Sequence, residues 1–335
     1  MRHPHRCTGW AGACLLGLLG AAPAGAQTNS YAQVSAYASH TREDTGQVFN
    51  DSDLVSVEGP GPFARIDVLA DSDGQSNVYN GLALAWAQVG AGGVHVFAQS
   101  QSVSSSVNQQ HTTGSGRATG IVADLFGLNV PGAAAGSLFT VTAQVRVDGS
   151  AWATTLPSWS GVYSANEVAA FSNWQSWIRL SQGASGPNLV ELRAGEDCDM
   201  RTTANIPLGC VPWGPAGLQT ISFQIINQGP LLQLYLNASA SAGTSNYQNN
   251  PGQLVADSQS DLGHTVAWAG VTELRDANGA AVGNFSMLSA SSGFDYRSAY
   301  VSAVPEVPTA WLLVAGLGLL GRRALAQRRH AQGQR

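Results

Sequence analysis

The chain contains no lysine, and this absence limits the partners that the protein can bind. All 16 basic residues are arginines. Between residues 27 and 303 there are 9 arginines, scattered singly, against 20 acidic residues, so this part carries a formal charge of −11. Nucleic acids and anionic lipids are bound by clustered basic side chains. We therefore expect no nucleic-acid partner.

Motifs for nucleophilic, metal or phosphate chemistry are also missing. The sequence has no Gly-x-Ser-x-Gly, no His-Glu-x-x-His and no Gly-x-x-x-x-Gly-Lys motif. We expect no enzymatic activity and no cofactor. Glycoside hydrolysis needs only two carboxylates across a cleft, so a glycoside hydrolase stays as the third hypothesis.

The first 26 residues have the three parts of a secretory signal peptide. Arg2 and Arg6 precede an apolar run over residues 14–19, and Ala24-Gly25-Ala26 follows. The run is too short to span a bilayer, and the small residues fit a signal peptidase. This order predicts a signal helix over residues 1–26, cleavage by signal peptidase and a mature chain that begins at Gln27.

Cysteine is scarce, and its positions point to an oxidising compartment. Two of the four cysteines lie within the signal peptide, which leaves Cys198 and Cys210. Two cysteines in an exported chain predict a disulfide. Closing a loop of this length contributes about 3 kcal/mol in the chain-entropy model. A metal site would need more ligands than this pair offers.

Residues 27–303 form one ectodomain with the period-two alternation of β-strands. Helical periodicity is scarce, and many short strands separated by Gly, Pro and Asn turns favour an antiparallel two-sheet sandwich, jelly-roll-like in type. The polar stretch Gln99–Gly116 is interpreted as an exposed loop or a solvated edge. Three hairpins are predicted around turns near residues 90–93, 227–230 and 276–279.

Two patterns are candidate binding sites within the ectodomain. Asp71, Asp73 and Asn77 offer oxygen ligands for calcium, although the glycine position differs from that of an EF-hand and a polar turn is the alternative. Among the aromatic residues between 152 and 177, Trp159, Trp174 and Trp177 are candidate carbohydrate contacts, with core packing as the alternative. We expect Trp152 and Trp159 to tend to the core and Trp174 or Trp177 to be more exposed.

The C-terminal 32 residues, 304–335, have three parts of their own. Val304, Pro305, Glu306, Val307 and Pro308 are followed by a short uncharged apolar run over residues 309–321 and an arginine-rich tail over 322–335. The run predicts a short transmembrane helix, below the roughly 20 residues of an ordinary span. The arginines, Arg322 and Arg323 first, would stay cytoplasmic and place the ectodomain outside.

This tripartite tail resembles the PEP-CTERM sorting signal, and the segment before it, from residue 268 to 296, resembles the closing region of ectodomains that carry that signal. Val307 departs from the family pattern, which has proline there. The resemblance implies processing by an exosortase-type membrane protease and a place at the cell surface or in an exopolysaccharide matrix. An ordinary C-terminal anchor is the alternative.

Together these patterns predict a protein exported through the inner membrane and anchored in it before processing. The main hypothesis is a non-catalytic surface or biofilm-matrix protein, with exopolysaccharide as a candidate partner. A carbohydrate-binding β-sandwich module is the alternative.

Overall fold

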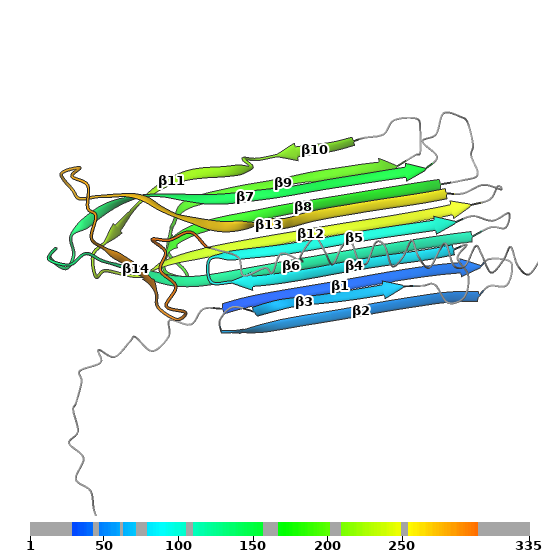
Figure 1. Cartoon of the computed structure of the whole chain (residues 1–335), viewed down its shortest axis with the longest axis horizontal. Coiled ribbons are helices and arrows are strands. Elements are labelled where there is room, and N and C mark those ends of the chain that lie inside the picture. Colours follow the sequence, from blue (N-terminus) through cyan, green and yellow to red (C-terminus); the bar gives the residue numbers. More distant parts are fainter. Residues whose placement is uncertain are drawn as a thin grey trace, which may run out of the picture.

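The computed structural model describes residues 29–42, 47–60, 63–71, 79–104, 110–156, 167–201, 209–248 and 254–300. These residues form two antiparallel β-sheets packed face to face, with the strands side by side along the long axis of the molecule (Figure 1). The expected all-β sandwich is confirmed.

One sheet, called sheet A, has eight strands, with β14 paired to β6 beside the order β10-β9-β8-β12-β6-β1-β2. Its strands are β1 (Asn29–Arg42), β2 (Gln47–Pro60), β6 (Gln110–Asn129), β8 (Glu167–Gln182), β9 (Asn188–Arg201), β10 (Gly209–Trp213), β12 (Leu232–Gln248) and β14 (Ser286–Ser289).

The other sheet, called sheet B, has six strands in the order β11-β7-β13-β5-β4-β3. Its strands are β3 (Phe63–Asp71), β4 (Tyr79–Gly90), β5 (Gly93–Ser104), β7 (Leu138–Leu156), β11 (Gly217–Ile226) and β13 (Leu254–Arg275). The predicted hairpin at residues 90–93 is confirmed, because Gly90 pairs with Gly93.

Over much of the strand length the two inner faces carry mostly small side chains. On sheet A the buried positions along three neighbouring strands are Ala32, Val34, Ala36 and Ala38, then Gly114, Gly116, Ala118 and Gly120, then Ala238, Ala240 and Ala242. On sheet B they include Ala83, Ala85 and Ala87, then Ala98, Ser100 and Ser102, then Ala256, Ser258 and Ser260. Alternation of period two therefore produces two smooth faces that can approach closely.

Two glycines of β6 show how close this approach is. A Cβ added at Gly116 would lie 2.7 Å from the carbonyl oxygen of Leu84 and 2.9 Å from that of Gln99, both in sheet B. A Cβ at Gly114 would lie 2.7 Å from the carbonyl oxygen of Leu82. Packed sheets are ordinarily about 10 Å apart, with side chains filling the space. Here one backbone packs directly against another.

Hydroxyl and amide groups fasten the two sheets together at the same end of the sandwich. The side chain of Asn246 in sheet A donates to the carbonyl oxygen of Ser102 in sheet B at 2.8 Å. Ser258 and Ser260 of sheet B donate to the carbonyl oxygens of Gly243 (3.1 Å) and Asn173 (2.6 Å) in sheet A. Short side chains reach the facing backbone because the sheets are so close.

The interpretation of Gln99–Gly116 as an exposed loop or solvated edge is wrong for its described residues. Residues 99–104 end β5 and residues 110–116 begin β6, two central strands. Ser100 is fully buried and its hydroxyl shares a hydrogen bond of 2.8 Å with that of Thr244 across the sheets. The polar composition belongs to a buried seam between the sheets.

Large side chains fill the opposite end of the sandwich. The rings of Phe126 and Tyr296 have centroids 4.7 Å apart, and Trp268 meets both, at 6.2 Å and 5.6 Å. All three side chains are fully buried. This aromatic cluster joins β6, β13 and the segment that follows β14.

Neither of the two helices predicted near the termini falls within the part that the structure describes. Residues 1–26 and 309–321 lie outside it. Among the described residues, no helix is long and apolar enough to span a membrane.

Replacing Gly116 with alanine should destabilise the protein, because the added methyl group would overlap backbone atoms that cannot move independently. We expect the free energy of unfolding to fall by about 1–3 kcal/mol, measured by urea denaturation. Gly283→Ala is the matched control, because a Cβ there meets nothing within 4 Å. A Gly116→Ala protein as stable as the Gly283→Ala protein would contradict the close sheet contact.

Candidate functional site

The outer face of sheet A gathers aromatic rings, guanidinium groups and amides. Along β8 the side chains alternate, so Trp174 and Ile178 are buried between the sheets, whereas Trp177 and Arg179 are half-buried on the outer face. Trp174 retains only 3 % exposure and offers no surface for a sugar ring. Of the three tryptophans considered from the sequence, Trp177 alone is placed on an outer face, since Trp159 lies outside the described residues.

The expectation for Trp152 is wrong. Trp152 is half-buried on the outer face of sheet B, between the inward-facing Ala151 and Ala153. The strand register explains the error, because Trp152 and Trp174 lie on opposite phases of the alternation in β7 and β8. The spacing of the polar residues around Trp174 did not indicate which face of the strand Trp174 would occupy.

Strand register aligns the outer-face residues in rows. Tyr31, Ile121, Asn237, Trp177 and Arg193 occupy one row across β1, β6, β12, β8 and β9. The next outward row on those central strands holds Tyr235, Arg179 and Glu191. We call Trp177, Arg179, Arg193 and Tyr235 the arginine–aromatic cluster.

Within this cluster, two guanidinium groups contact the same indole ring. The Cζ atoms of Arg179 and Arg193 lie 5.3 Å and 4.7 Å from the centroid of Trp177. Arg179 also lies 5.0 Å from the ring of Tyr235, which meets Trp177 edge-on at 5.2 Å. Cation–π contacts of this kind hold a guanidinium in a defined plane.

The two arginines differ in their acidic partners. Arg193 forms an ion pair with Glu191 at 2.7 Å. Arg179 has no ion pair or hydrogen bond with any described residue, and its buried Nε atom has no acceptor. The positive charge of Arg179 is therefore not paired with an acidic side chain of any described residue.

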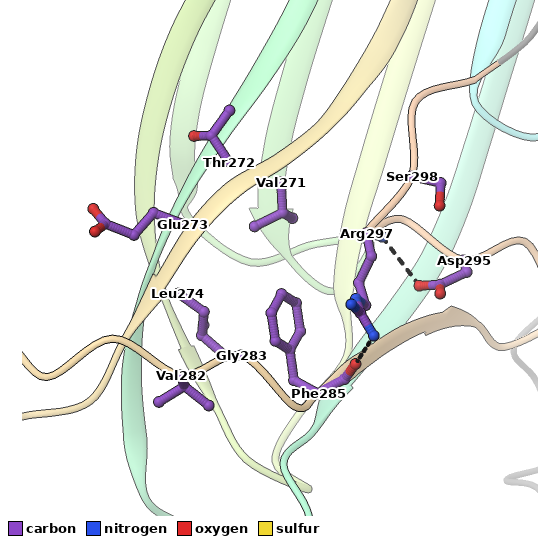
Figure 2. A pocket seen from close by; sticks show the side chains of 10 residues that line it. All are labelled: Val271, Thr272, Glu273, Leu274, Val282, Gly283, Phe285, Asp295, Arg297 and Ser298. Carbon is purple, nitrogen blue, oxygen red and sulfur yellow. Dashed lines mark hydrogen bonds between the residues drawn. The ribbon is translucent and has the colours of Figure 1, made fainter.

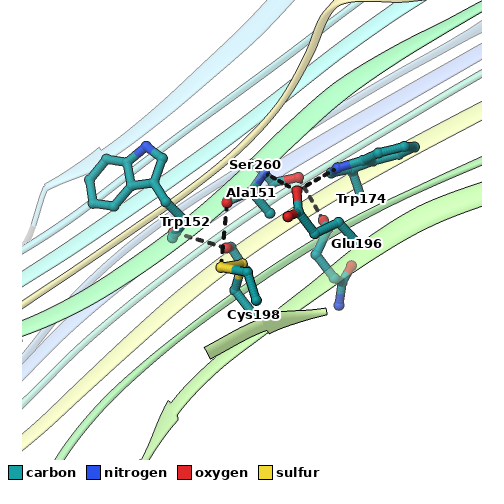
Figure 3. The surroundings of a disulfide bond; sticks show 9 residues. Ala151, Trp152, Trp174, Glu196, Cys198 and Ser260 are labelled. Atoms are coloured by element: carbon teal, nitrogen blue, oxygen red, sulfur yellow. Dashed lines mark hydrogen bonds between the residues drawn. A yellow bond between two sulfur atoms is a disulfide. The ribbon is translucent and has the colours of Figure 1, made fainter. Parts of the chain in front are cut away.

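The predicted disulfide is present at the edge of sheet A. Cys198 on β9 lies directly opposite Cys210 on β10, with sulfur atoms 1.99 Å apart (Figure 3). Glu196 lies near both sulfur atoms. Because both sulfurs are engaged in the disulfide, they do not offer the thiolates that a metal site would need.

Glu196 has a structural role and is not assigned to a metal site. Its Oε2 atom accepts hydrogen bonds from the backbone nitrogen of Ala151 in sheet B (2.9 Å) and from the indole of Trp174 in sheet A (3.3 Å), as Figure 3 shows. The carboxylate thereby joins the two sheets beside the disulfide.

A buried carboxylate organises the C-terminal end of the sandwich. Asp124 accepts hydrogen bonds from the hydroxyls of Ser289 (2.9 Å), Ser291 (3.2 Å) and Tyr296 (2.7 Å). Burial, together with the charge of Asp124 and the hydrogen bond to it, raises the pKa of Tyr296 well above its ordinary value. Tyr296 therefore stays protonated and acts as a donor rather than as a base.

Removing the hydroxyl of Tyr296 should leave the buried Asp124 carboxylate short of a donor. We expect Tyr296→Phe to lower the free energy of unfolding by about 1.5–3 kcal/mol, measured by chemical denaturation. Tyr31→Phe, on the outer face, is the matched control and should change stability far less. Equal effects of the two substitutions would show that Asp124 does not depend on this hydrogen bond.

A shallow hollow of about 520 Å³ lies beside the end of β13 (Figure 2). Its two carboxylates are engaged by neighbours. Glu273 pairs with Arg275 at 2.6 Å, and Asp295 accepts from the backbone nitrogen of Arg297 at 3.0 Å. The Arg297 guanidinium donates to the carbonyl oxygen of Phe285 at 2.7 Å and lies over its ring. The hollow is therefore lined by groups that hold this loop in place.

On the outer face of sheet B, Asp257 lies among carboxamides. The side chain of Gln101 donates to Asp257 at 3.5 Å. Partial burial raises the pKa of the Asp257 carboxyl above its ordinary value, although hydrogen bonds from the Ser258 backbone and from Gln101 and Gln99 oppose the shift. The folded protein consequently binds this proton more tightly than the unfolded chain does.

Stability should therefore fall as pH rises from 3.8, the ordinary pKa of Asp257, through its raised folded value, because the folded state binds more protons in that window. Replacing Asp257 with asparagine removes this contribution. We expect Asp257→Asn to gain stability relative to wild type as pH increases across the window, measured by urea unfolding at several pH values. Asp67→Asn on the same face controls for the loss of one charge. A pH-independent difference between Asp257→Asn and wild type would contradict the assignment.

The other residues considered from the sequence are not brought together. Asp71 ends β3, exposed, and its backbone nitrogen donates to Asp51 at 2.9 Å. Its expected companions in a calcium site, Asp73 and Asn77, lie outside the described residues. The same holds for the sorting motif, residues 304–308, and for Arg322 and Arg323.

The arginine–aromatic cluster is the functional candidate that sequence reasoning missed. Trp177 and Arg179 are two residues apart on a strand, so alternation alone would have placed them on one face. Their contacts with Arg193 and Tyr235 depend on strand pairing, which the sequence did not specify.

Comparison with protein-family models, with curated proteins and with solved structures gives no significant match for this chain.

Proposed function

We propose that the protein is an exported, non-catalytic component of the cell surface or extracellular matrix. The observation that carries the proposal is the disulfide between Cys198 and Cys210, the only cysteines of the chain after Gln27. Disulfides persist in oxidising compartments and are rare in the cytosol. The bond supports the export that the signal peptide predicts.

The position of Tyr300 supports a separate sorting tail. The Tyr300 backbone nitrogen donates to the carbonyl oxygen of Trp268 at 2.9 Å, and its ring lies over Gly90 and Gly93. Tyr300, the last described residue, thus still packs on the sandwich four positions before Val304. In our proposal the tail from Val304 contributes no packing to the ectodomain and serves transport and processing.

The proposed route runs from the signal helix to the tail. Signal peptidase removes residues 1–26, the helix over residues 309–321 holds the chain in the inner membrane, and the arginines after Gly321 stay cytoplasmic. An exosortase-type protease then acts near Pro305-Glu306. We also propose that the sandwich is of the jelly-roll-like type.

A carbohydrate-binding module is the second candidate, and the arginine–aromatic cluster favours it, because rings interleaved with amides suit sugar faces and hydroxyls. A glycoside hydrolase would require two free carboxylates facing each other across a cleft. At the hollow beside β13, Glu273 and Asp295 are each bound by a neighbour, which favours the non-catalytic function.

Fractionation of cells that express three forms of the protein tests the sorting proposal. Wild type should be processed and lose its C-terminal residues by intact mass. A truncation after Ala303 should fold and be released without the membrane step. Arg322/Arg323→Ala should be held less firmly in the inner membrane and be processed less efficiently, because the cytoplasmic stop is weakened.

Two outcomes would contradict the proposal. Wild-type protein that still carries Arg335 at the cell surface would make the tail an ordinary anchor. A truncated ectodomain that cannot fold would show that the tail is part of the domain.

A further inference from the structure

We propose that the outer face of sheet A binds a carboxylate-bearing polysaccharide and that Arg179 recognises its carboxylate groups. The inference rests on the proposed function in one respect, since an extracellular location places this face in contact with such polymers. The cluster around Trp177 carries the inference.

Arg179 is held in place but not neutralised. Its guanidinium lies 5.3 Å from the ring of Trp177 and 5.0 Å from the ring of Tyr235. Asn237 donates to the Tyr235 hydroxyl at 3.2 Å and thereby fixes that ring. A guanidinium held in this way loses less conformational entropy when it binds a ligand.

The ion pairs among the neighbouring residues leave Arg179 as the arginine of the cluster that can bind an anion. Arg193, the cross-strand partner of Trp177 on β9, is paired with Glu191 at 2.7 Å, and Glu191 is also the cross-strand neighbour of Arg179. Glu191 further accepts a hydrogen bond from Asn188 at 2.9 Å. Both oxygens of Glu191 are thus engaged by Arg193 and Asn188. The Nε atom of Arg179 is buried, so the two Nη groups are the donors that Arg179 can offer to an acceptor from outside the chain.

Carboxylate is the acceptor that this geometry suits best. A planar guanidinium binds a carboxylate through two parallel N–H···O hydrogen bonds, and it keeps its charge at any physiological pH. The ectodomain as a whole is acidic, with a formal charge of −11 over residues 27–303. The overall charge therefore does not favour binding of an acidic ligand, so we expect such binding to depend on a local contact.

The shape of the face favours a polymer over a small molecule. The row from Tyr31 to Arg193 crosses five paired strands, which is about 19 Å at the ordinary strand spacing. In this row Ile121 and Asn237 lie between the rings of Tyr31 and Trp177. A chain of sugars along this row can place a ring face on Tyr31, hydroxyls on the amide of Asn237 and its carboxylates near Arg179.

Binding of the full chain to polygalacturonic acid, with methyl-esterified polygalacturonic acid as the neutral counterpart, tests the inference. The protein is immobilised in a nonionic detergent, and binding is measured at low and at physiological ionic strength. Wild type should bind the acid and bind the ester much more weakly. Arg179→Gln should weaken binding of the acid roughly tenfold or more, and Arg179→Lys should weaken it less.

Arg275→Gln is the matched control, because Arg275 is an exposed arginine of sheet B that pairs with Glu273. It should bind the acid like wild type. Thermal unfolding of each variant establishes that it is folded. Since Arg179→Lys keeps the charge on the same strand, it also reports on recognition if Arg179→Gln unfolds.

Three outcomes would overturn the inference: equal binding of the acid by wild type and Arg179→Gln, equal binding of acid and ester by wild type, or no binding of either polymer. The sorting proposal can fail independently of the polysaccharide inference. A protein that is processed and released normally but ignores both polymers refutes only the polysaccharide inference. A protein that binds the acid but is never processed refutes only the sorting proposal.

Discussion

The direct contact between the two sheets is the constraint on which the rest of this structure depends. At Gly116 the backbone of sheet A leaves no room for a methyl group before the carbonyl oxygens of Leu84 and Gln99 in sheet B. Alanine and serine extend the contact along the strands, and serine hydroxyls close it with hydrogen bonds between the sheets. Less apolar area is buried per residue than in a core of large side chains. Hydrogen bonds, the aromatic cluster and the disulfide stabilise the packing of the two sheets further.

The strand pairing of sheet A shapes the surface that we propose to be functional. Because neighbouring strands pair in register, outward-facing side chains form rows across the sheet, as Tyr31, Ile121, Asn237, Trp177 and Arg193 do. An extended face of this kind suits an extended ligand. The disulfide edge and the C-terminal aromatic cluster hold the ends of the sandwich without contributing to that face.

Much of the fold could be predicted from the sequence, because period-two alternation is a local signal. The alternation and the glycine turn gave the hairpin over residues 82–98 correctly. The hairpin expected over residues 221–236 is wrong, since β11 lies in sheet B and β12 in sheet A. Whether a turn joins strands of one sheet or of two is decided by tertiary packing. Buried serines in 99–116 and the inward orientation of Trp174 were missed for the same reason: polar composition and spacing do not reveal what faces a side chain across the core.

Amide hydrogen exchange of the folded protein tests the close sheet contact most directly. The account predicts that amides of β6 near Gly114 and Gly116, and of β5 near Ser100, exchange as slowly as those beside the buried Phe126 and Trp268. Both ends of the sandwich would then open only with the whole domain. Exchange that is orders of magnitude faster at the end with small residues, while the aromatic end stays protected, would contradict it. Such a result would show that the glycine, alanine and serine faces do not hold the sheets together.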